Sequence, residues 1–486
     1  MNAAMDLSRR RFMAGSATVL AFSGYATLVG AQEDAPLPAL DTARLRGIAL
    51  ASEIDGYGAL QPDPAGLFDL PAGFSYKIVS QAGDVMSDGL LTPHKADGMG
   101  AFAGPEGKTI LVRNHELKPL DLDLGAFGPG RTLASKVAAD RFYDLTDNGL
   151  PMTGGTTTLV WDTRSQTLET HHLSLAGTTT NCAGGRTPRG TWLSCEETTQ
   201  GKGVEAQKDH GYVFEVPSTL RGIADPTPIT AMGRFRHEAN ATDPRTGIVY
   251  MTEDMGDGFG LFYRYLPNDR DRLLSGGKLQ ALALPERAAA DPRNWDDRYW
   301  GPGDSRLVHW IDLDGVDNPL EDLRYRGHAA GAAWFARGEG IYFENGELFF
   351  ACTSGGPQQL GQIYRYRPSE HEGQPGERGQ PGKLTLFVEP TDGAALTMCD
   401  NIAVAPWGHL FVCEDKLEGV NALRAVTPSG KLYTIGRNVQ RDTRSDVVNS
   451  ELAGVCFSPD GTTCFVNIYW PGITIAITGP WGALKA

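Results

Sequence analysis

Residues 181–197 read NCAGGRTPRGTWLSCEE, a stretch with the composition of a β-hairpin. Two glycines follow the first strand, a Thr-Pro-Arg-Gly turn reverses the chain, and an apolar strand returns. The ends of such a hairpin lie side by side, which brings Cys182 close to Glu196 and Glu197. A thiolate beside carboxylates suits a transition metal such as iron or zinc, with calcium able to take the surplus oxygens. The alternative is that Cys182 is a small buried apolar residue.

The same hairpin pattern recurs along the chain. Each copy has an acidic or thiol residue at the start of its first strand, a turn with glycine, and an apolar second strand with a polar end. The six copies span residues 97–116, 182–197, 237–254, 337–356, 400–415 and 451–468. Further strand-like runs lie between them, at 211–216, 260–265, 362–366 and 422–426, and would complete each blade as outer strands. The repeat predicts an all-β fold, a six-bladed β-propeller.

The repeat leaves three other regions to be assigned. Residues 1–31 are predicted to be an export signal and 32–486 a single propeller domain with an irregular lead-in at 32–73. Loop and short-helix insertions at 117–155 and 266–331 are expected to cover one face. Residues 371–383 are interpreted as a polar, flexible excursion without assigned chemistry.

Composition limits the classes of partner. With 60 Gly, 30 Pro and 21% charged residues, the 486-residue chain is turn-rich and globular, not disordered. Its formal net charge of −15 argues against nucleic acid or an anionic membrane as a partner and is compatible with bound cations. Seven cysteines leave at least one thiol unpaired, so a cysteine ligand is permitted.

The N-terminus has the pattern of a twin-arginine export signal. Residues 8–13 read SRRRFM, and a weakly apolar run follows to Ala31, where processing is expected. The alternative, a transmembrane anchor, is disfavoured by the Gly, Ser and Ala content of that run. We therefore expect a periplasmic or secreted protein, exported folded by the twin-arginine machinery, with no stable membrane span after processing. We expect a monomer.

Equivalent positions of a propeller's innermost strands meet around its channel. The aligned first-strand positions form a ring of Asp97, Cys182, Glu238, Glu339, Asp400 and Glu451. The second strands end at the same rim with Glu116, Glu196, Glu197, Glu253, Asp254, Glu414 and Asp415. Two carboxylates about 4 Å apart repel by roughly 4 kcal/mol at an effective dielectric near 20, so cations are expected between them. The alternative for each acid taken singly is a salt bridge or a turn cap.

Arg337 stands two residues before Glu339, so both side chains point to the same face of a strand. An arginine facing metals and acids is suited to gripping an anionic substrate bidentately, with phosphate the leading case. The alternative is a salt bridge between Arg337 and a ring acid. Further candidates near the rim are Asn114, His115, His237, Asn240 and Asn401.

Several motifs resemble those of the PhoX-type secreted alkaline phosphatases. They are the twin-arginine leader, NCAGGRTPRGTWLSCEE, RFRHEAN, RGEG, CDNIAVAPWG and ELAGVCFSPDG, and together they cover essentially the mature chain. The resemblance implies a β-propeller whose channel holds iron (Fe³⁺) and calcium (Ca²⁺), with oxo-bridged irons of which one is bound by a cysteine. By resemblance, the site residues are the iron ligand Cys182, the metal ligands Glu238, Glu339 and Asp400, the phosphate-binding Arg337, and the further ligands Glu196, Glu197, Asp254 and Glu451. The chain departs from the family where Arg189 replaces a common Trp, and it is shorter than many members, which bears on substrate range.

These observations predict a phosphoric monoester hydrolase that acts on small phosphorylated substrates. A metal-bound oxygen would attack phosphorus in line, while the ions and Arg337 neutralise charge on the phosphoryl oxygens. No G-x-S-x-G motif for a serine nucleophile appears. Two alternatives remain: a calcium-dependent lactonase or phosphotriesterase-like propeller, which needs neither Cys182 nor Arg337, and a noncatalytic propeller braced by metals.

Overall fold

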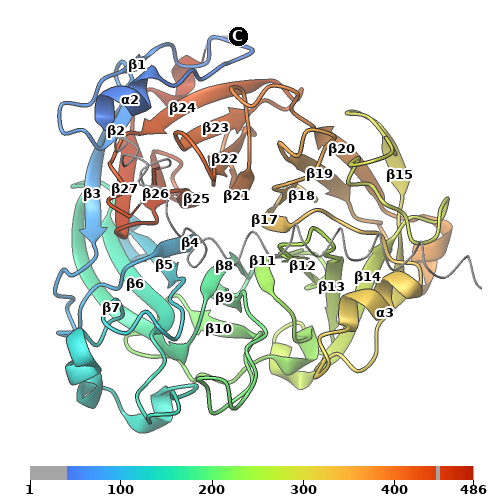
Figure 1. The fold of residues 1–486 in the computed structure, drawn as a ribbon, viewed down its shortest axis with the longest axis horizontal. Helices are drawn as coiled ribbons and strands as arrows, with labels where there is room; N and C mark the ends of the chain where they lie inside the picture. Colours follow the sequence, from blue (N-terminus) through green and yellow to red (C-terminus); the bar gives the residue numbers. More distant parts are fainter. Residues whose placement is uncertain (1–40, 445–448, 485–486) are drawn as a thin grey trace, which may run out of the picture. The chain divides into compact units, whose positions relative to one another are not determined.

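The computed structural model describes residues 41–444 and 449–484, which form six antiparallel sheets around a central axis (Figure 1). Each sheet is one blade, and the innermost strands contact one another in a ring. In order of blades 1 to 6, these strands are β4 (Ala96–Ala103), β8 (Asn181–Arg186), β11 (His237–Thr242), β17 (Gly338–Glu344), β21 (Cys399–Val404) and β25 (Leu452–Phe457). The predicted six-bladed propeller is confirmed. The proposed export signal lies outside the described residues.

The outer strands complete the blades, in sequence order except for β15, which precedes its blade. Blade 1 adds β5 (Thr109–His115), β6 (Gly154–Asp162) and β7 (Thr167–Thr178), and blade 2 adds β9 (Thr191–Glu196) and β10 (Val213–Pro217). Blade 3 adds β12 (Val249–Glu253), β13 (Phe262–Pro267), β14 (Gly277–Ala283) and β16 (His309–Asp312). Blade 4 adds β18 (Glu347–Cys352), β19 (Gln362–Arg367), β20 (Lys383–Val388) and β15 (Ser305–Leu307). Blade 5 adds β22 (Leu410–Glu414), β23 (Ala422–Val426) and β24 (Leu432–Asn438), and blade 6 adds β26 (Thr463–Ile468) and β27 (Ile473–Thr478).

Strands from the N-terminal region finish the last two blades. β3 (Ser75–Gln81) pairs with β27 as the outer strand of blade 6 and closes the ring. β2 (Phe68–Pro71) pairs with β24, and β1 (Leu60–Gln61) pairs with β2, so both extend blade 5. The predicted lead-in also contains α2 (Thr42–Gly47). With β1, β2 and α2, its described part is only partly irregular.

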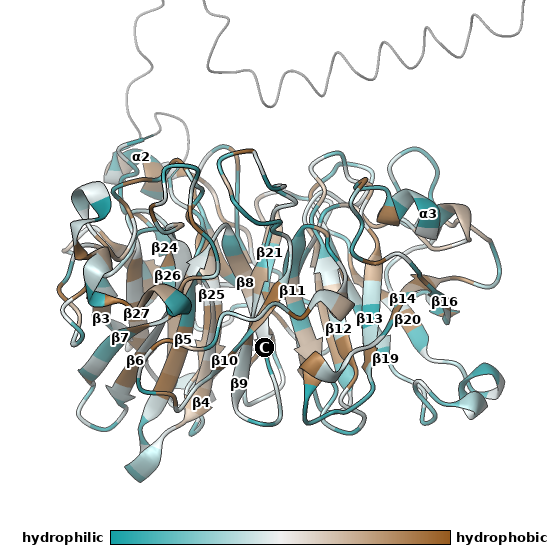
Figure 2. Cartoon of the chain, turned by 90° about the horizontal axis from the view of Figure 1, so that it is seen from below, coloured by the Kyte–Doolittle hydropathy of each residue, from teal (hydrophilic) through white to brown (hydrophobic). Residues whose placement is uncertain are grey.

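The insertion at 266–331 also contains more regular structure than expected. Its residues 279–283 are buried in β14, which extends blade 3, and β15 crosses to the edge of blade 4. Only α3 (Leu323–Ala329) and the connecting loops fit the prediction of a short-helix cover. α2 and α3 lie at the same end of the sheets (Figure 2).

The excursion at 371–383 is anchored, contrary to the interpretation of a purely flexible loop. Glu372 is buried and pairs with Arg264 of β13 at 2.5 Å, and Glu377 accepts a hydrogen bond from Arg264 Nη2 at 2.8 Å. The Arg264 guanidinium also stacks on Trp310, 4.4 Å from its ring centre. These contacts fasten the loop between blades 3 and 4.

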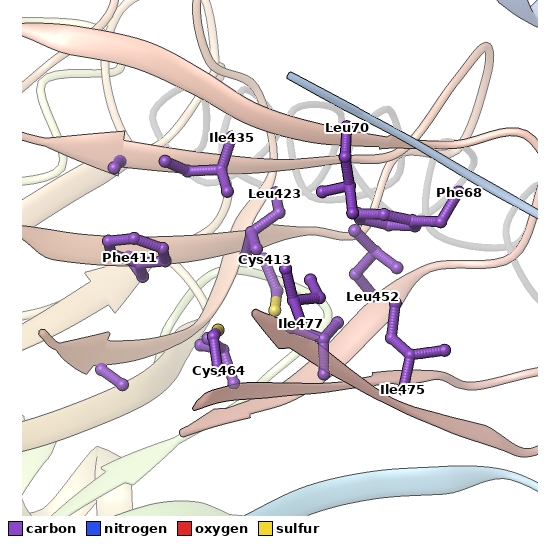
Figure 3. Packing of buried hydrophobic residues seen from close by; sticks show 14 of the residues in the cluster. Phe68, Leu70, Phe411, Cys413, Leu423, Ile435, Leu452, Cys464, Ile475 and Ile477 are labelled. Carbon is purple, nitrogen blue, oxygen red and sulfur yellow. The ribbon is translucent and has the colours of Figure 1, made fainter. Parts of the chain in front are cut away.

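Apolar faces of neighbouring blades form the core. In the junction of blades 5 and 6, Phe411 and Cys413 lie beside Cys464 and Ile477, and Phe68 of β2 covers the outer side (Figure 3). Each of these side chains is at most 1% exposed, and burial of one contributes about 1.5–3 kcal/mol. All seven cysteines of the chain lie in the described residues and are free thiols. Hydrophobic residues follow the strands, while the loops at both ends are mostly hydrophilic (Figure 2).

Candidate metal and phosphate site

A β-bulge recurs near the start of each innermost strand. The pairing with the second strand skips between residues 96 and 99, 181 and 184, 237 and 240, 338 and 341, 399 and 402, and 453 and 456. At each bulge two residues face one on the partner strand, which redirects a side chain. In blades 1 to 5 the first bulge residue is the predicted ring residue: Asp97, Cys182, Glu238, Glu339 or Asp400. The repeat alignment of these five positions is therefore confirmed.

The sixth ring position is aligned wrongly. The bulge of blade 6 begins at Gly454, so Glu451 lies three residues before the equivalent point, just outside β25. A side chain at Gly454 would collide with Asp97, because a Cβ atom there would lie 2.4 Å from the Asp97 carbonyl oxygen and its φ is +61°. Glu451 nevertheless joins the cluster, since burial, Asp415 and Asp97 raise its pKa well above the usual value.

Three carboxylates meet at the centre of the cluster. One oxygen each from Glu238, Glu339 and Asp400 lies within 4.8 Å of the other two. Burial raises the pKa of Glu238 well above its usual value, and the nearby Asp400 adds to the effect. Burial and the neighbouring Asp415 raise the pKa of Asp400 to about 7. Within the described part of the chain, the buried Oε2 of Glu238 has no hydrogen-bond partner. These oxygens fit a cation, which would remove the cost of crowding them.

A thiol completes one side of this centre. Cys182 Sγ lies 3.5 Å from Asp97 Oδ2 as a donor, and burial raises its pKa well above the usual value, with further contributions from Asp97 and Glu238. Burial, Glu116 and Glu238 likewise raise the pKa of Asp97. Protons or cations must therefore neutralise this group, and a soft sulfur beside oxygens is a suitable donor set for iron.

Adjacent acids at the ends of the second strands point in different directions. Glu196 accepts hydrogen bonds from His210 Nδ1 at 2.7 Å and from the backbone N–H of Gly211 at 2.9 Å and of Thr179 at 3.1 Å. Its neighbour Glu197 is instead in the cluster, where burial, Asp254 and Glu116 raise its pKa. Because successive side chains of a strand alternate, only the second acid of such a pair faces the channel. The prediction of Glu196 as a metal ligand is therefore wrong.

The same alternation sorts the other rim acids. Glu253 accepts from Leu261 N and Tyr263 Oη, and Glu414 accepts from the backbone of the next strand, so both are structural. Asp254 and Asp415, which follow them, face the cluster, as their effects on the ring carboxyls show. Asp415 and Glu116 were predicted only as rim acids, and strand alternation would have identified them as channel-facing.

Arg337 lies at the edge of the cluster and makes the salt bridge that was its alternative role. Its Nε and Nη2 donate to the two carboxylate oxygens of Asp254 at 3.0 and 2.7 Å, and Nη2 is 3.1 Å from Glu339 Oε1. The φ of Arg337 is +55°, a backbone conformation uncommon for a non-glycine residue. The guanidinium of Arg337 thus binds the two Asp254 oxygens bidentately, and two oxygens of a phosphate could be bound in the same geometry.

Of the remaining candidates, Asn401 belongs to the site. Its Nδ2 donates to Asp400 Oδ1 at 3.1 Å, and its Oδ1 accepts from Gly454 N at 2.8 Å, so it orients a ring carboxylate. The other four, Asn114, His115, His237 and Asn240, make hydrogen bonds within and between blades. Two exposed cations beside the cluster, Lys118 and Arg236, were not predicted.

Small residues allow close packing of neighbouring innermost strands beside the bulges. A Cβ atom at Gly98 would lie 2.4 Å from Ala183 Cα, and one at Gly340 would lie 2.7 Å from Asn401 Cα. A cavity of about 710 Å³ lies further along the innermost strands, and its lining includes Arg186 but none of the five bulge residues of blades 1 to 5. The ring residues therefore do not line this cavity.

Comparisons with known proteins identify the family of the chain. A comparison with curated proteins gives no match. Pseudomonas fluorescens PhoX in complex with vanadate, a transition state analogue, is 18% identical and covers 91% of this chain and 98% of its own, with a TM-score of 0.61. The Pseudomonas aeruginosa periplasmic gluconolactonase PpgL is 12% identical and covers 85% of this chain and 94% of its own, with a TM-score of 0.39. The family model "Alkaline phosphatase PhoX" matches residues 55–472, and the chain therefore belongs to the PhoX alkaline phosphatase family.

Proposed function

We propose that the chain hydrolyses phosphate monoesters with metal ions held in the acid and thiol cluster. The observation that carries the proposal is the convergence of Glu238, Glu339 and Asp400 within 4.8 Å, beside an arginine fork, in a chain of this family. A lactonase propeller would need neither Cys182 nor Arg337, and a noncatalytic brace would need no arginine beside the ions.

The donor types suggest how the ions are shared. Cys182 with Asp97 and Glu238 suits iron, and the remaining carboxylates, Glu339 and Asp400 among them, suit calcium. Glu197, Asp254 and Glu451 complete the ligand set. When bound, such ions polarise a phosphoryl oxygen and activate water at neutral to alkaline pH.

The chain's own residues bind and orient the substrate. Arg337 offers two parallel N–H donors, which match two phosphate oxygens and stabilise the charge that spreads over them during transfer. Asn401 fixes the orientation of Asp400 through a 3.1 Å hydrogen bond. The close backbone packing at Gly98 and Gly340 leaves no room for a side chain between neighbouring innermost strands beside these bulges.

We also infer that the chain works outside the cytoplasm. The motif SRRRFM at residues 8–13 supports export by the twin-arginine route, which carries folded proteins. In residues 41–444 and 449–484, no helix is long and apolar enough to cross a membrane.

The test pairs two cysteines of one hairpin. Protein exported by its own host is analysed for iron and calcium and assayed with p-nitrophenyl phosphate at alkaline pH, as wild type, Cys182→Ser and Cys195→Ser. Cys195 is a buried thiol in β9 that contacts Asn240 at 3.2 Å, so it controls for loss of a thiol. We expect Cys182→Ser alone to lose iron and hydrolysis together. A metal-loaded, folded wild type that releases no phosphate would reject the proposal.

A further inference from the structure

Three cations lie along one side of the acid cluster. Each pairs with one rim carboxylate: Lys118 with Glu116, Arg236 with Glu197, and Arg337 with Asp254. Backbone hydrogen bonds join the three pairs: Thr180 N–H donates to the Leu117 carbonyl at 2.9 Å, Glu197 N–H to the Thr180 carbonyl at 2.8 Å, and Asp254 N–H to the Arg236 carbonyl at 3.3 Å. The cations therefore follow the rim from blade 1 past blade 3 to blade 4.

The three cations are held very differently. Arg337 forms a two-point salt bridge at 2.7 and 3.0 Å, and its side chain is 24% exposed. Lys118 Nζ lies 3.8 Å from Glu116 and Arg236 Nη1 lies 3.9 Å from Glu197, both beyond hydrogen-bond distance. Their side chains are 63% and 45% exposed. Both are therefore free to turn toward an anion in solvent at small cost, whereas Arg337 is fixed against the cluster.

The two exposed cations offset the negative charge of the molecule locally. A chain of net charge −15 with an acidic channel repels polyanions unless local cations offset that field. Under the proposed function, an ester phosphate in contact with Arg337 would already be neutralised by that arginine and the bound ions, without Lys118 or Arg236. A second anionic group on the same substrate would extend outward, along the rim where the two loose cations lie.

We propose that Arg236 and Lys118 bind a second anionic group of the substrate, so that the chain prefers phosphate monoesters carrying a carboxylate or further phosphate near the ester. This inference rests on the proposed function. Arg236 is the main specificity residue, because its planar fork can bind a carboxylate at two points, and Lys118 adds a point charge. Neither residue is assigned a part in the cleavage step.

Two esters that differ by one charge test the inference. 3-Phosphoglycerate and glycerol 3-phosphate share a three-carbon skeleton and differ at C1, a carboxylate in one and a hydroxymethyl group in the other. The measurement is the ratio of their kcat/KM values for wild type, Arg236→Gln and the double variant with Lys118→Gln. The control is Arg367→Gln, which removes an exposed, ion-paired arginine at the far end of blade 4, beside Glu347.

The wild-type ratio should exceed one and fall about fivefold in Arg236→Gln, as expected for the loss of one solvent-exposed ion pair. The double variant should lower it further, and Arg367→Gln should leave it at the wild-type value. Raising the ionic strength should lower the wild-type ratio and have a smaller effect in the double variant, because exposed charges are screened. Hydrolysis of both esters at a ratio unchanged by either variant would overturn this inference and leave the proposed function standing. A wild type that hydrolyses p-nitrophenyl phosphate but neither of these two esters would also overturn this inference alone, whereas a wild type that hydrolyses none of the three would reject the proposed function.

Discussion

Glu196 and Glu197 are neighbours in sequence with opposite roles, and exchanging each for glutamine separates folding from metal binding. Glu196 is fully buried and bonds to His210, which Asp144 holds on the other side at 3.1 Å. In Glu196→Gln the amide group would face N–H donors and His210 would keep only one acidic partner. Breaking a buried ion pair costs roughly 3–5 kcal/mol.

That cost has a measurable size. At roughly 0.9 kcal/mol/K of unfolding entropy for a domain of this size, it lowers Tm by about 3–5 °C. The assay is a thermal melt with metal analysis of the same samples. Glu196→Gln should have a lower Tm at full metal content, and Glu197→Gln should lose metal. After chelator treatment, Glu197→Gln should melt no earlier than chelator-treated wild type, because it has one fewer carboxylate in the crowded cluster. Loss of metal in Glu196→Gln at an unchanged Tm would refute the assignment of the two side chains.

Three further results are expected. Burial lowers the pKa of His210, but Glu196 and Asp144 outweigh it and raise the pKa from 6.5 to about 9. The protonated His210 therefore contributes about 3 kcal/mol to the free energy of unfolding, fully present below pH 6.5 and lost as pH rises through 9. Thermal melts at pH 6.5 and pH 10 should show this loss of stability in wild type and not in His210→Gln. Arg337→Lys keeps the charge but not the fork, so kcat/KM for p-nitrophenyl phosphate should fall roughly 10²–10³-fold at unchanged metal content, and a fall below threefold would contradict a phosphate-binding role. Removal of metal with a chelator should lower Tm more at pH 8 than at pH 5. Asp400 has a pKa of about 7, so at pH 5 it is protonated and repels the neighbouring carboxylates less once the metal is gone. An equal drop in Tm at the two pH values would contradict this role of Asp400.

The sequence predicted the ring where the repeat is regular and failed where local geometry differs. Asp97 and Cys182 were found because equivalent bulge positions of successive blades meet at one channel. Glu451 was misaligned because the sixth bulge begins three residues later, a shift that apolar periodicity does not reveal. Glu196 was misassigned because the motif contains two adjacent acids, and strand alternation decides which one faces the channel.

Pairings between distant segments were the hardest to predict. The strand at Phe68–Pro71 and the loop at 371–383 gave no strong local signal, because their positions depend on partners far away in the sequence, Asn438 and Arg264. For Arg337 the alternative role is confirmed, since it makes a salt bridge with Asp254, while phosphate binding by Arg337 stays a prediction.

The pairing of β3 with β27 joins residues 75–81 to residues 473–478. During translation, β3 can pair with β27 only after nearly the whole chain has been synthesised. Asp97 of blade 1 and Glu451, just before β25 of blade 6, come together only then, so binding of the proposed ions is expected to follow synthesis of the chain. A chain that stops before residue 450 would lose one blade, leave a strand edge open to aggregation, and hold an incomplete set of ligands.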